Sequence, residues 1–183
     1  DESLIQELIK VGNLTPGIVK RLCNQICLAE EAGADLVLDT CSSTSPGVNT
    51  ARDMVDIPIL KIDDPMTEKA VELGERIGVL ATAKSTFKPS TELVKSKAGE
   101  GHDIEVNSVL VEEAFEALLD GDNQTHDKLV TSNAVELAQN NEVLVLAQAS
   151  MSHLAPEISK EVDVPVLTSP DLAMEAVKQI LSK

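Results

Sequence analysis

A six-residue segment occurs twice in this sequence, and the two copies lie 107 positions apart. The first copy, Val55–Leu60, is VDIPIL, and the second, Val162–Leu167, is VDVPVL. The segment Leu36–Leu38 also matches Leu144–Leu146, at an offset of 108. Because both matches keep the same order and nearly the same offset, they predict two similar lobes related by a pseudo-twofold axis.

Short β-branched segments alternate with helical patterns along the chain. The expected strands lie at residues 36–39, 57–60, 77–81, 104–110, 143–147 and 164–167. The expected helices lie near residues 15–31, 47–54, 65–75, 86–98, 112–119, 125–140, 152–161 and 171–181. Strands of this kind, alternating with helices, are typical of parallel sheets covered by helices, so the expected fold class is α/β.

The repeat also predicts where the lobes begin and end. We expect lobe 1 to comprise residues 1–72 and 170–183, and lobe 2 to comprise residues 73–169. The strand–helix–strand segment at residues 77–110 has no counterpart in the first half of the chain. By analogy with the repeat, we expect the equivalent strand–helix–strand segment of lobe 1 to be missing before residue 1. The alternative is that the two lobes are unequal.

Composition excludes several classes of function. The chain has 15 Lys and Arg against 31 Asp and Glu, a net charge of −16, and aromatic residues make up 1% of it. Binding to nucleic acid needs cationic side chains and stacking aromatics, so no nucleic-acid partner is expected. The longest apolar runs are too short to span a bilayer, so no membrane contact is expected either. An odd count of three cysteines favours a reducing, cytoplasmic location.

Cys41 follows an expected strand directly and precedes an expected helix. In a parallel α/β sheet, ligands bind at the carboxyl ends of the strands. The partial positive charge of a helix N-terminus there favours a thiolate, and the hydroxyl groups of Thr40, Ser42, Ser43 and Thr44 can hold a carboxylate. The alternative is a buried cysteine in a helix-capping sequence. Cys23 and Cys27 are expected to be buried thiols, and no metal site is expected because no further ligand joins them.

Three segments resemble the aspartate/glutamate/hydantoin racemase superfamily: Asp39–Ser43, the strand at 77–82, and Val143–Met151. The resemblance covers nearly the whole chain, in order. It implies two flavodoxin-like lobes with parallel sheets and a cleft between them. It also implies an isomerase that needs neither pyridoxal phosphate nor any other cofactor and inverts the carbon next to a carboxylate. The family's tendency to dimerise implies a homodimer.

The resemblance assigns two cysteines, one from each lobe, to opposite faces of the substrate carbon. Cys41 matches the first of them, whereas the position of the second is occupied by Ala149. A methyl group cannot carry a proton, so another group must act on that face. Gln148, Ser150 and His153 are the nearest candidates, and His153 has the most suitable unperturbed pKa. A surface histidine is the alternative interpretation of His153.

The turn after the strand at 77–81 lines the cleft in the family, so Thr82, Ser85 and Thr86 are expected to bind the substrate carboxylate. These hydroxyls can also cap the helix that begins there. The full set of expected substrate-binding residues is Thr40, Ser42, Ser43, Thr82, Ser85, Thr86, Gln148, Ala149 and Ser150. The pseudo-twofold relation further places the Cys41 thiol within a substrate's width of residues 148–150.

Three functions remain open at this point. The first is a racemase or epimerase that acts on an amino acid or a related small carboxylate, with Cys41 as one acid/base. The second, suggested by Ala149, is a lyase, a decarboxylase or a cis–trans isomerase of small dicarboxylates with a single cysteine. The third is a carboxylate-binding protein without catalytic activity.

Overall fold

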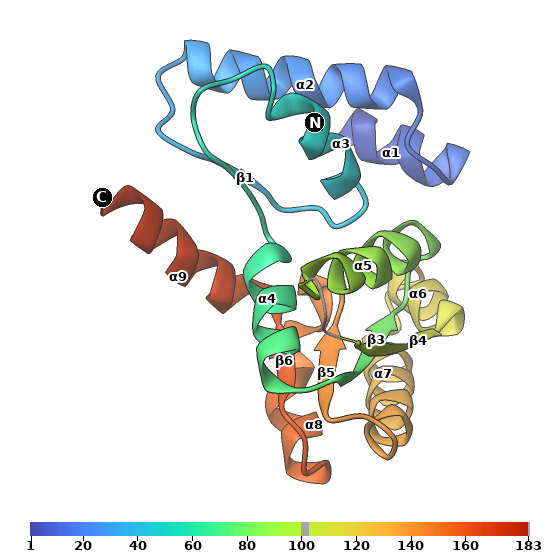
Figure 1. Cartoon of the computed structure of the whole chain (residues 1–183). Coiled ribbons are helices and arrows are strands. Elements are labelled where there is room, and N and C mark those ends of the chain that lie inside the picture. The colour runs from blue at the N-terminus through green and yellow to red at the C-terminus, as the bar shows by residue number, and fades with distance from the viewer. Residues whose placement is uncertain (100–102, 183) are drawn as a thin grey trace.

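The computed structural model describes residues 1–99 and 103–182, and within them the strands form two parallel sheets (Figure 1). The smaller sheet pairs β1 (Val37–Asp39) with β2 (Ile59–Lys61). The larger sheet has the order β4-β3-β5-β6. Its strands are β3 (Arg76–Ala81), β4 (Glu105–Leu110), β5 (Val143–Leu146) and β6 (Val166–Thr168). Every pair of neighbouring strands in both sheets is parallel, so the predicted α/β fold with parallel sheets is confirmed. Strands β1 and β5 lie in different sheets.

The helices cover these sheets, and most of them lie where the sequence predicts. The first sheet carries α1 (Glu2–Val11), α2 (Pro16–Glu31) and α3 (Ser45–Ala51). The larger sheet carries α4 (Asp64–Leu73), α5 (Lys84–Lys97), α6 (Glu112–Leu119), α7 (Asn123–Ala138) and α8 (Ala155–Glu161). A 3-10 helix, η1 (Ala149–Leu154), precedes α8, and α9 (Ser169–Leu181) follows β6.

Strand β5 shows why the larger sheet is buried on both faces. Its four residues are all buried and point alternately to opposite sides. Leu144 and Leu146 pack in a cluster with side chains of α7 and α8, whereas Val143 and Val145 pack in a cluster with side chains of α4 and α5. A strand that is covered on both faces has no polar alternation, which explains its continuous apolar sequence.

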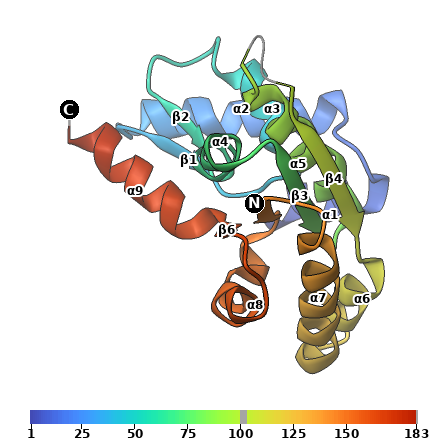
Figure 2. The same ribbon diagram turned by 60° about the horizontal axis from the view of Figure 1, so that its bottom comes forward.

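Helix α4 packs on the larger sheet. Met66 and Ala70 of α4 belong to the same buried cluster as Ile77 and Val79 of β3. Helix α9 extends away from the end of β6 and contacts α4, β2 and η1 (Figure 2). The division into lobes at residues 72 and 170 stays a prediction, and so does the missing strand–helix–strand segment of lobe 1.

Helix α1 was not expected from the sequence. Leu4 and Leu8 lie one turn apart on its buried face and pack with Ile18 of α2. This spacing is the local signal of an amphipathic helix. Across the described ranges 1–99 and 103–182, the helices lack the length and apolar character that a membrane crossing requires.

Candidate functional site

The carboxyl ends of β1, β3 and β5 lie close together, where the smaller sheet meets the larger one. The Ser42 hydroxyl, after β1, donates a hydrogen bond to the carbonyl oxygen of Ala147, after β5, at 3.2 Å. The Ser43 hydroxyl donates to Ser85 Oγ at 3.0 Å and lies 3.2 Å from Thr86 Oγ1, both at the start of α5. The structure therefore brings together four of the predicted site residues, Ser42 and Ser43 after β1 and Ser85 and Thr86 after β3, and Ser42 also reaches the end of β5.

Cys41 lies in the turn between β1 and α3. Its carbonyl oxygen accepts hydrogen bonds from the backbone N–H groups of Thr44 (3.0 Å) and Ser45 (3.2 Å), which close the turn. The thiol is free and half-buried. This placement confirms that Cys41 follows a strand and precedes a helix.

The Asp39 carboxylate stabilises this turn. Its carboxylate accepts hydrogen bonds from the Thr44 hydroxyl at 2.8 Å and from the Ser45 hydroxyl at 3.2 Å. Burial raises the pKa of Asp39, although these hydroxyl groups oppose the shift. The two bonds tie the end of β1 to the start of α3 and thereby hold the loop that carries Cys41.

A hollow of about 250 Å³ lies beside Cys41. Its walls come from α1, α2, β1 and the turn after β1, and they include Leu4, Leu22, Ile26 and Thr40. These residues all belong to the first 44 positions of the chain. A different hollow, of about 210 Å³, is lined by Thr82, Ser85 and side chains of α1 and α6. Cys41 and Thr82 thus line different hollows here, and a cleft shared by Cys41 and residues 148–150 stays a prediction.

The two other cysteines lie on α2. Cys23 is buried, and its burial, followed by the neighbouring Cys27, raises the pKa of the Cys23 thiol. Cys27 is only half-buried, so the expectation of burial is correct for Cys23 and only partly correct for Cys27. The described part of the chain holds no group of three or more His, Cys, Asp or Glu side chains with the geometry of a metal site.

The shortest hydrogen bond among the predicted site residues joins Thr82 to Gln148, at 2.6 Å. Gln148 Oε1 accepts hydrogen bonds from the backbone N–H groups of Thr82 at 2.6 Å and Ala83 at 3.2 Å. Two N–H donors require the amide oxygen rather than the nitrogen at this point. Both donors lie at the start of α5, where the helix dipole favours negative charge. The Gln148 oxygen therefore occupies a position that suits a carboxylate oxygen.

His153 bonds to Ser150 of its own turn and to Asp127 of α7. Its Nδ1 lies 2.9 Å from the carbonyl oxygen of Ser150, and its Nε2 lies 3.1 Å from Asp127 Oδ1 on α7. The same Asp127 oxygen lies 2.8 Å from Nδ1 of the buried His126. Burial raises the pKa of Asp127, but the hydrogen bonds from the two histidines outweigh it, and the net shift is downward. These contacts hold the ring of His153 against α7.

The remaining predicted residues are accessible. Ala149 and Ser150 begin η1 and are exposed, and Thr40 is exposed after β1. An exposed Ala149 leaves room for water at the position where the resemblance expects a second cysteine.

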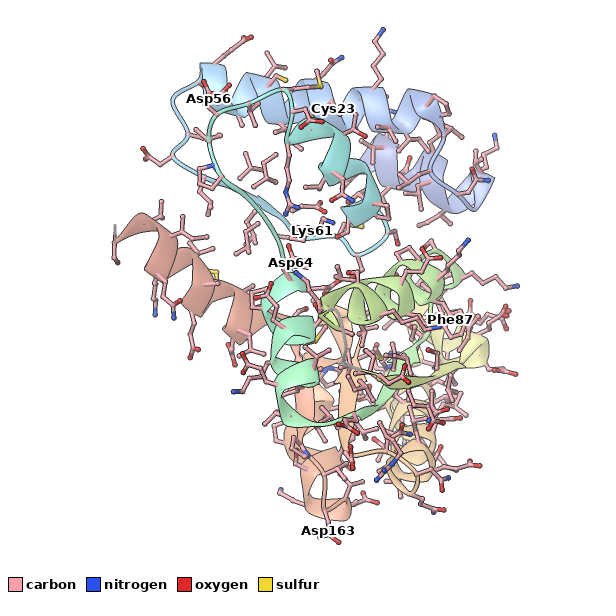
Figure 3. The ribbon with its side chains drawn as sticks, in the orientation of Figure 1. Cys23, Asp56, Lys61, Asp64, Phe87 and Asp163 are labelled. Atoms are coloured by element: carbon pink, nitrogen blue, oxygen red, sulfur yellow. The ribbon has the colours of Figure 1, made fainter. Side chains whose placement is uncertain are left out.

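Asp63 is a polar residue of this junction that sequence reasoning missed. It follows β2 and is the N-cap residue of α4, and only 1% of its surface is exposed. Burial raises its pKa to about 6. A carboxyl group at the end of a strand was the available signal. Its neighbours Lys61 and Asp64 are labelled in Figure 3, where the chain passes from the first sheet into α4.

A family model described as Asp/Glu/hydantoin racemase matches residues 5–177. The chain belongs to this family. A hydantoin racemase from Rhizobium meliloti is 24% identical over 160 residues, which cover 86% of this chain and 64% of that protein. The racemase resemblance predicted from the sequence is therefore confirmed.

Solved structures agree with this assignment at the level of the fold. A glutamate racemase from Bacillus anthracis has a TM-score of 0.71 and 16% identity, over 90% of this chain and 65% of that one. An allantoin racemase from Klebsiella pneumoniae has a TM-score of 0.70 and 18% identity, over 90% of this chain and 66% of that one. The chain spans just under two thirds of the length of each of these three racemases.

Proposed function

We propose that this protein is a cofactor-independent racemase or epimerase of an amino acid or a related small carboxylate, with Cys41 as one acid/base. The observation that carries the proposal is a free, half-buried thiol at the end of β1, in a chain of the racemase family. The adjacent Ser42 contacts Ala147, two residues before Ala149, so the two strand ends that the repeat relates lie side by side.

In the proposed reaction, the substrate lies in the predicted cleft shared by Cys41 and residues 148–150. Its carboxylate displaces the Gln148 oxygen and accepts hydrogen bonds from the N–H groups of Thr82 and Ala83. The Cys41 thiolate removes the proton from the α-carbon, and the electron pair of the broken C–H bond delocalises into the carboxylate. The negative charge that develops there is stabilised by the two N–H donors and the N-terminus of α5. Return of a proton to the opposite face completes the inversion.

The delivery of a proton to the opposite face is the step in which this chain departs from the family pattern. Ala149 cannot supply it, and both ring nitrogens of His153 lie against other acceptors. Gln148 holds no transferable proton at neutral pH. We propose that water beside the exposed Ala149 or the exposed Ser150 hydroxyl delivers this proton.

A second candidate function follows from the same alanine. An enzyme with one thiol can protonate an enediolate on a single face after loss of carbon dioxide, which needs no second acid/base. The substrate in that case is a small dicarboxylate with both carboxyl groups on one carbon. Elimination and cis–trans isomerisation of small dicarboxylates are further reactions open to a single thiol.

The test is incubation of the protein with single enantiomers of amino acids, hydantoins and allantoin in heavy water. We expect deuterium at the α-carbon and the opposite enantiomer by chiral chromatography. Cys41→Ser should abolish both signals and keep the circular dichroism spectrum, whereas Cys27→Ser, which changes a thiol on α2, should keep the activity. Absence of exchange across the panel would overturn the racemase proposal.

Disubstituted malonates in the same assay separate the alternatives. Release of carbon dioxide with a single product enantiomer, and no exchange with amino acids, would favour the decarboxylase. A carboxylate that binds with equal affinity to the protein and to Cys41→Ala, without any turnover, would favour a binding protein. The predicted homodimer is checked separately by analytical ultracentrifugation.

A further inference from the structure

Lys61, the last residue of β2, is a buried cation whose hydrogen-bond partner is neutral (Figure 3). Only 5% of its surface is exposed. Its ammonium group donates a hydrogen bond to Oδ1 of Asn49 on α3, at 2.8 Å, and forms no ion pair with a carboxylate of residues 1–99 or 103–182. Lysine is almost never buried to this extent unless an acidic group pairs with it. Lys61 is thus an uncompensated positive charge in a chain whose net charge is −16.

The acidic groups nearest to Lys61 bind other partners. The Asp64 carboxylate contacts Lys97 at 2.8 Å and Arg52 at 3.4 Å. The Asp39 carboxylate accepts hydrogen bonds from two hydroxyl groups of its own turn. Burial lowers the pKa of Lys61, and Arg52 and Lys97 add to this shift, whereas Asp64 and Asp39 oppose it. An anion beside the ammonium group would offset the cost of burying it.

A hollow of about 190 Å³ adjoins Lys61 and Asn49, between α3, β2 and α5. Its apolar wall includes Pro46 of α3 and Leu93 of α5. Among the described residues that line it, there is neither Cys41 nor any residue of the turn at 148–150. This hollow is therefore separate from the proposed catalytic site.

The polar groups at the hollow match the two oxygens of a carboxylate. An ammonium group has three N–H donors, and the Asn49 oxygen accepts one of them. Because lysine can only donate, Asn49 must present its oxygen to Lys61, and its NH2 group then has no acceptor among the described residues. One carboxylate oxygen can accept from Lys61 and the other from Asn49, and a hydrogen bond between two charged groups is strong.

Glu92 restricts the ligand to a single carboxylate. It lines the hollow from α5, and its side chain is 63% exposed, with Lys88 at 3.6 Å. A second carboxylate on the ligand would be repelled by this charge. An alkyl group can instead contact Pro46 and Leu93, and the volume of the hollow limits it to a small one.

We propose that Lys61 and Asn49 form a second binding site, which takes a small monocarboxylate. The site holds whether or not Cys41 transfers protons, because Cys41 takes no part in it.

The test is an NMR titration of the ¹⁵N-labelled protein, in which sodium acetate replaces sodium chloride at constant ionic strength. Acetate should shift the side-chain amide signals of Asn49 in a saturable way. The signals of Asn140, an exposed control that follows α7, should stay unchanged. Absence of a shift at Asn49 would overturn the proposal.

Lys61→Met removes the cation and keeps a side chain of similar length. We expect acetate to bind to this variant roughly 10- to 100-fold more weakly. Lys69→Met, which removes an exposed lysine of α4, should keep the wild-type affinity, and so should Cys41→Ala. Equal affinity of Lys61→Met and the wild type would overturn the proposal, whereas a failure of the racemase assay would leave these binding results unchanged.

A comparison of two ligands keeps the proposal testable if Lys61→Met does not fold. Succinate, a dicarboxylate, should bind to the wild type more weakly than acetate, because Glu92 repels its second carboxylate. Glu92→Gln should remove this difference. Succinate that binds to the wild type as tightly as acetate would overturn the assignment to monocarboxylates.

Discussion

Replacement of Gln148 by alanine tests whether the start of α5 is a carboxylate site. The Gln148 oxygen accepts from the N–H groups of Thr82 and Ala83, and both residues are buried. The substitution leaves these two donors without their partner and opens the space that the amide occupied. A free carboxylate can supply two oxygens of the same kind at this point.

The magnitude follows from the two backbone N–H groups that lose their acceptor. An internal hydrogen bond contributes about 1 kcal/mol net, and a donor left unsatisfied costs about 1–3 kcal/mol. Because water can enter the opened space, we expect Gln148→Ala to lower the free energy of unfolding by about 2 kcal/mol. A bound carboxylate at ten times its dissociation constant should restore about 1.4 kcal/mol.

The assay is urea denaturation with and without acetate or malonate, at constant ionic strength. We expect these anions to stabilise Gln148→Ala more than the wild type, in which the site is already filled. Gln148→Glu keeps an acceptor oxygen and should not be rescued, and Gln139→Ala, an exposed control, should stay within about 0.5 kcal/mol of the wild type. Equal stabilisation of Gln148→Ala and the wild type by carboxylates would refute the assignment.

Three further predictions concern accessibility and packing. Iodoacetamide should label the half-buried Cys41 before the buried Cys23, as mass spectrometry of partly labelled protein would show, and labelling in the reverse order would contradict the proposed acid/base. Gly78→Ala should destabilise by about 1–3 kcal/mol, because the new Cβ would lie 2.7 Å from Leu144 Cδ2 in the buried sheet. Gly17→Ala on α2, where the nearest atom is 3.7 Å away, should instead stabilise by about 0.5–1 kcal/mol in the same thermal melt.

Much of the fold could be predicted because its signals are local. Strands such as Val143–Leu146 are short apolar runs, and the flanking helices have their own periodicity and caps. The repeat of VDIPIL and VDVPVL added the two-sheet arrangement, which no single element specifies. Helix α1 was overlooked although Leu4 and Leu8 carry an adequate signal.

The candidate site could be predicted only in outline. The end of β1 identified Cys41, Ser42 and Ser43, because a parallel sheet presents its strand ends at one edge. The bonding of His153 to Asp127 on α7 could not be foreseen, since the partners lie 26 positions apart on separate helices. The unperturbed pKa of histidine shows only that the side chain can transfer protons near neutral pH. The partners of its ring nitrogens in the folded chain decide whether it is placed to do so.

By itself, the sequence determined which residues stand at the strand ends, because side-chain periodicity and turn chemistry act over a few residues. The tertiary structure alone decided which of these residues meet. Gln148 bonds to Thr82 across 66 positions, and the side chain of Asp63, at the N-terminus of α4, is buried only in the folded chain. Burial and hydrogen bonding, which set the charge of a carboxyl group and the occupant of a helix N-terminus, exist only after the two sheets have come together.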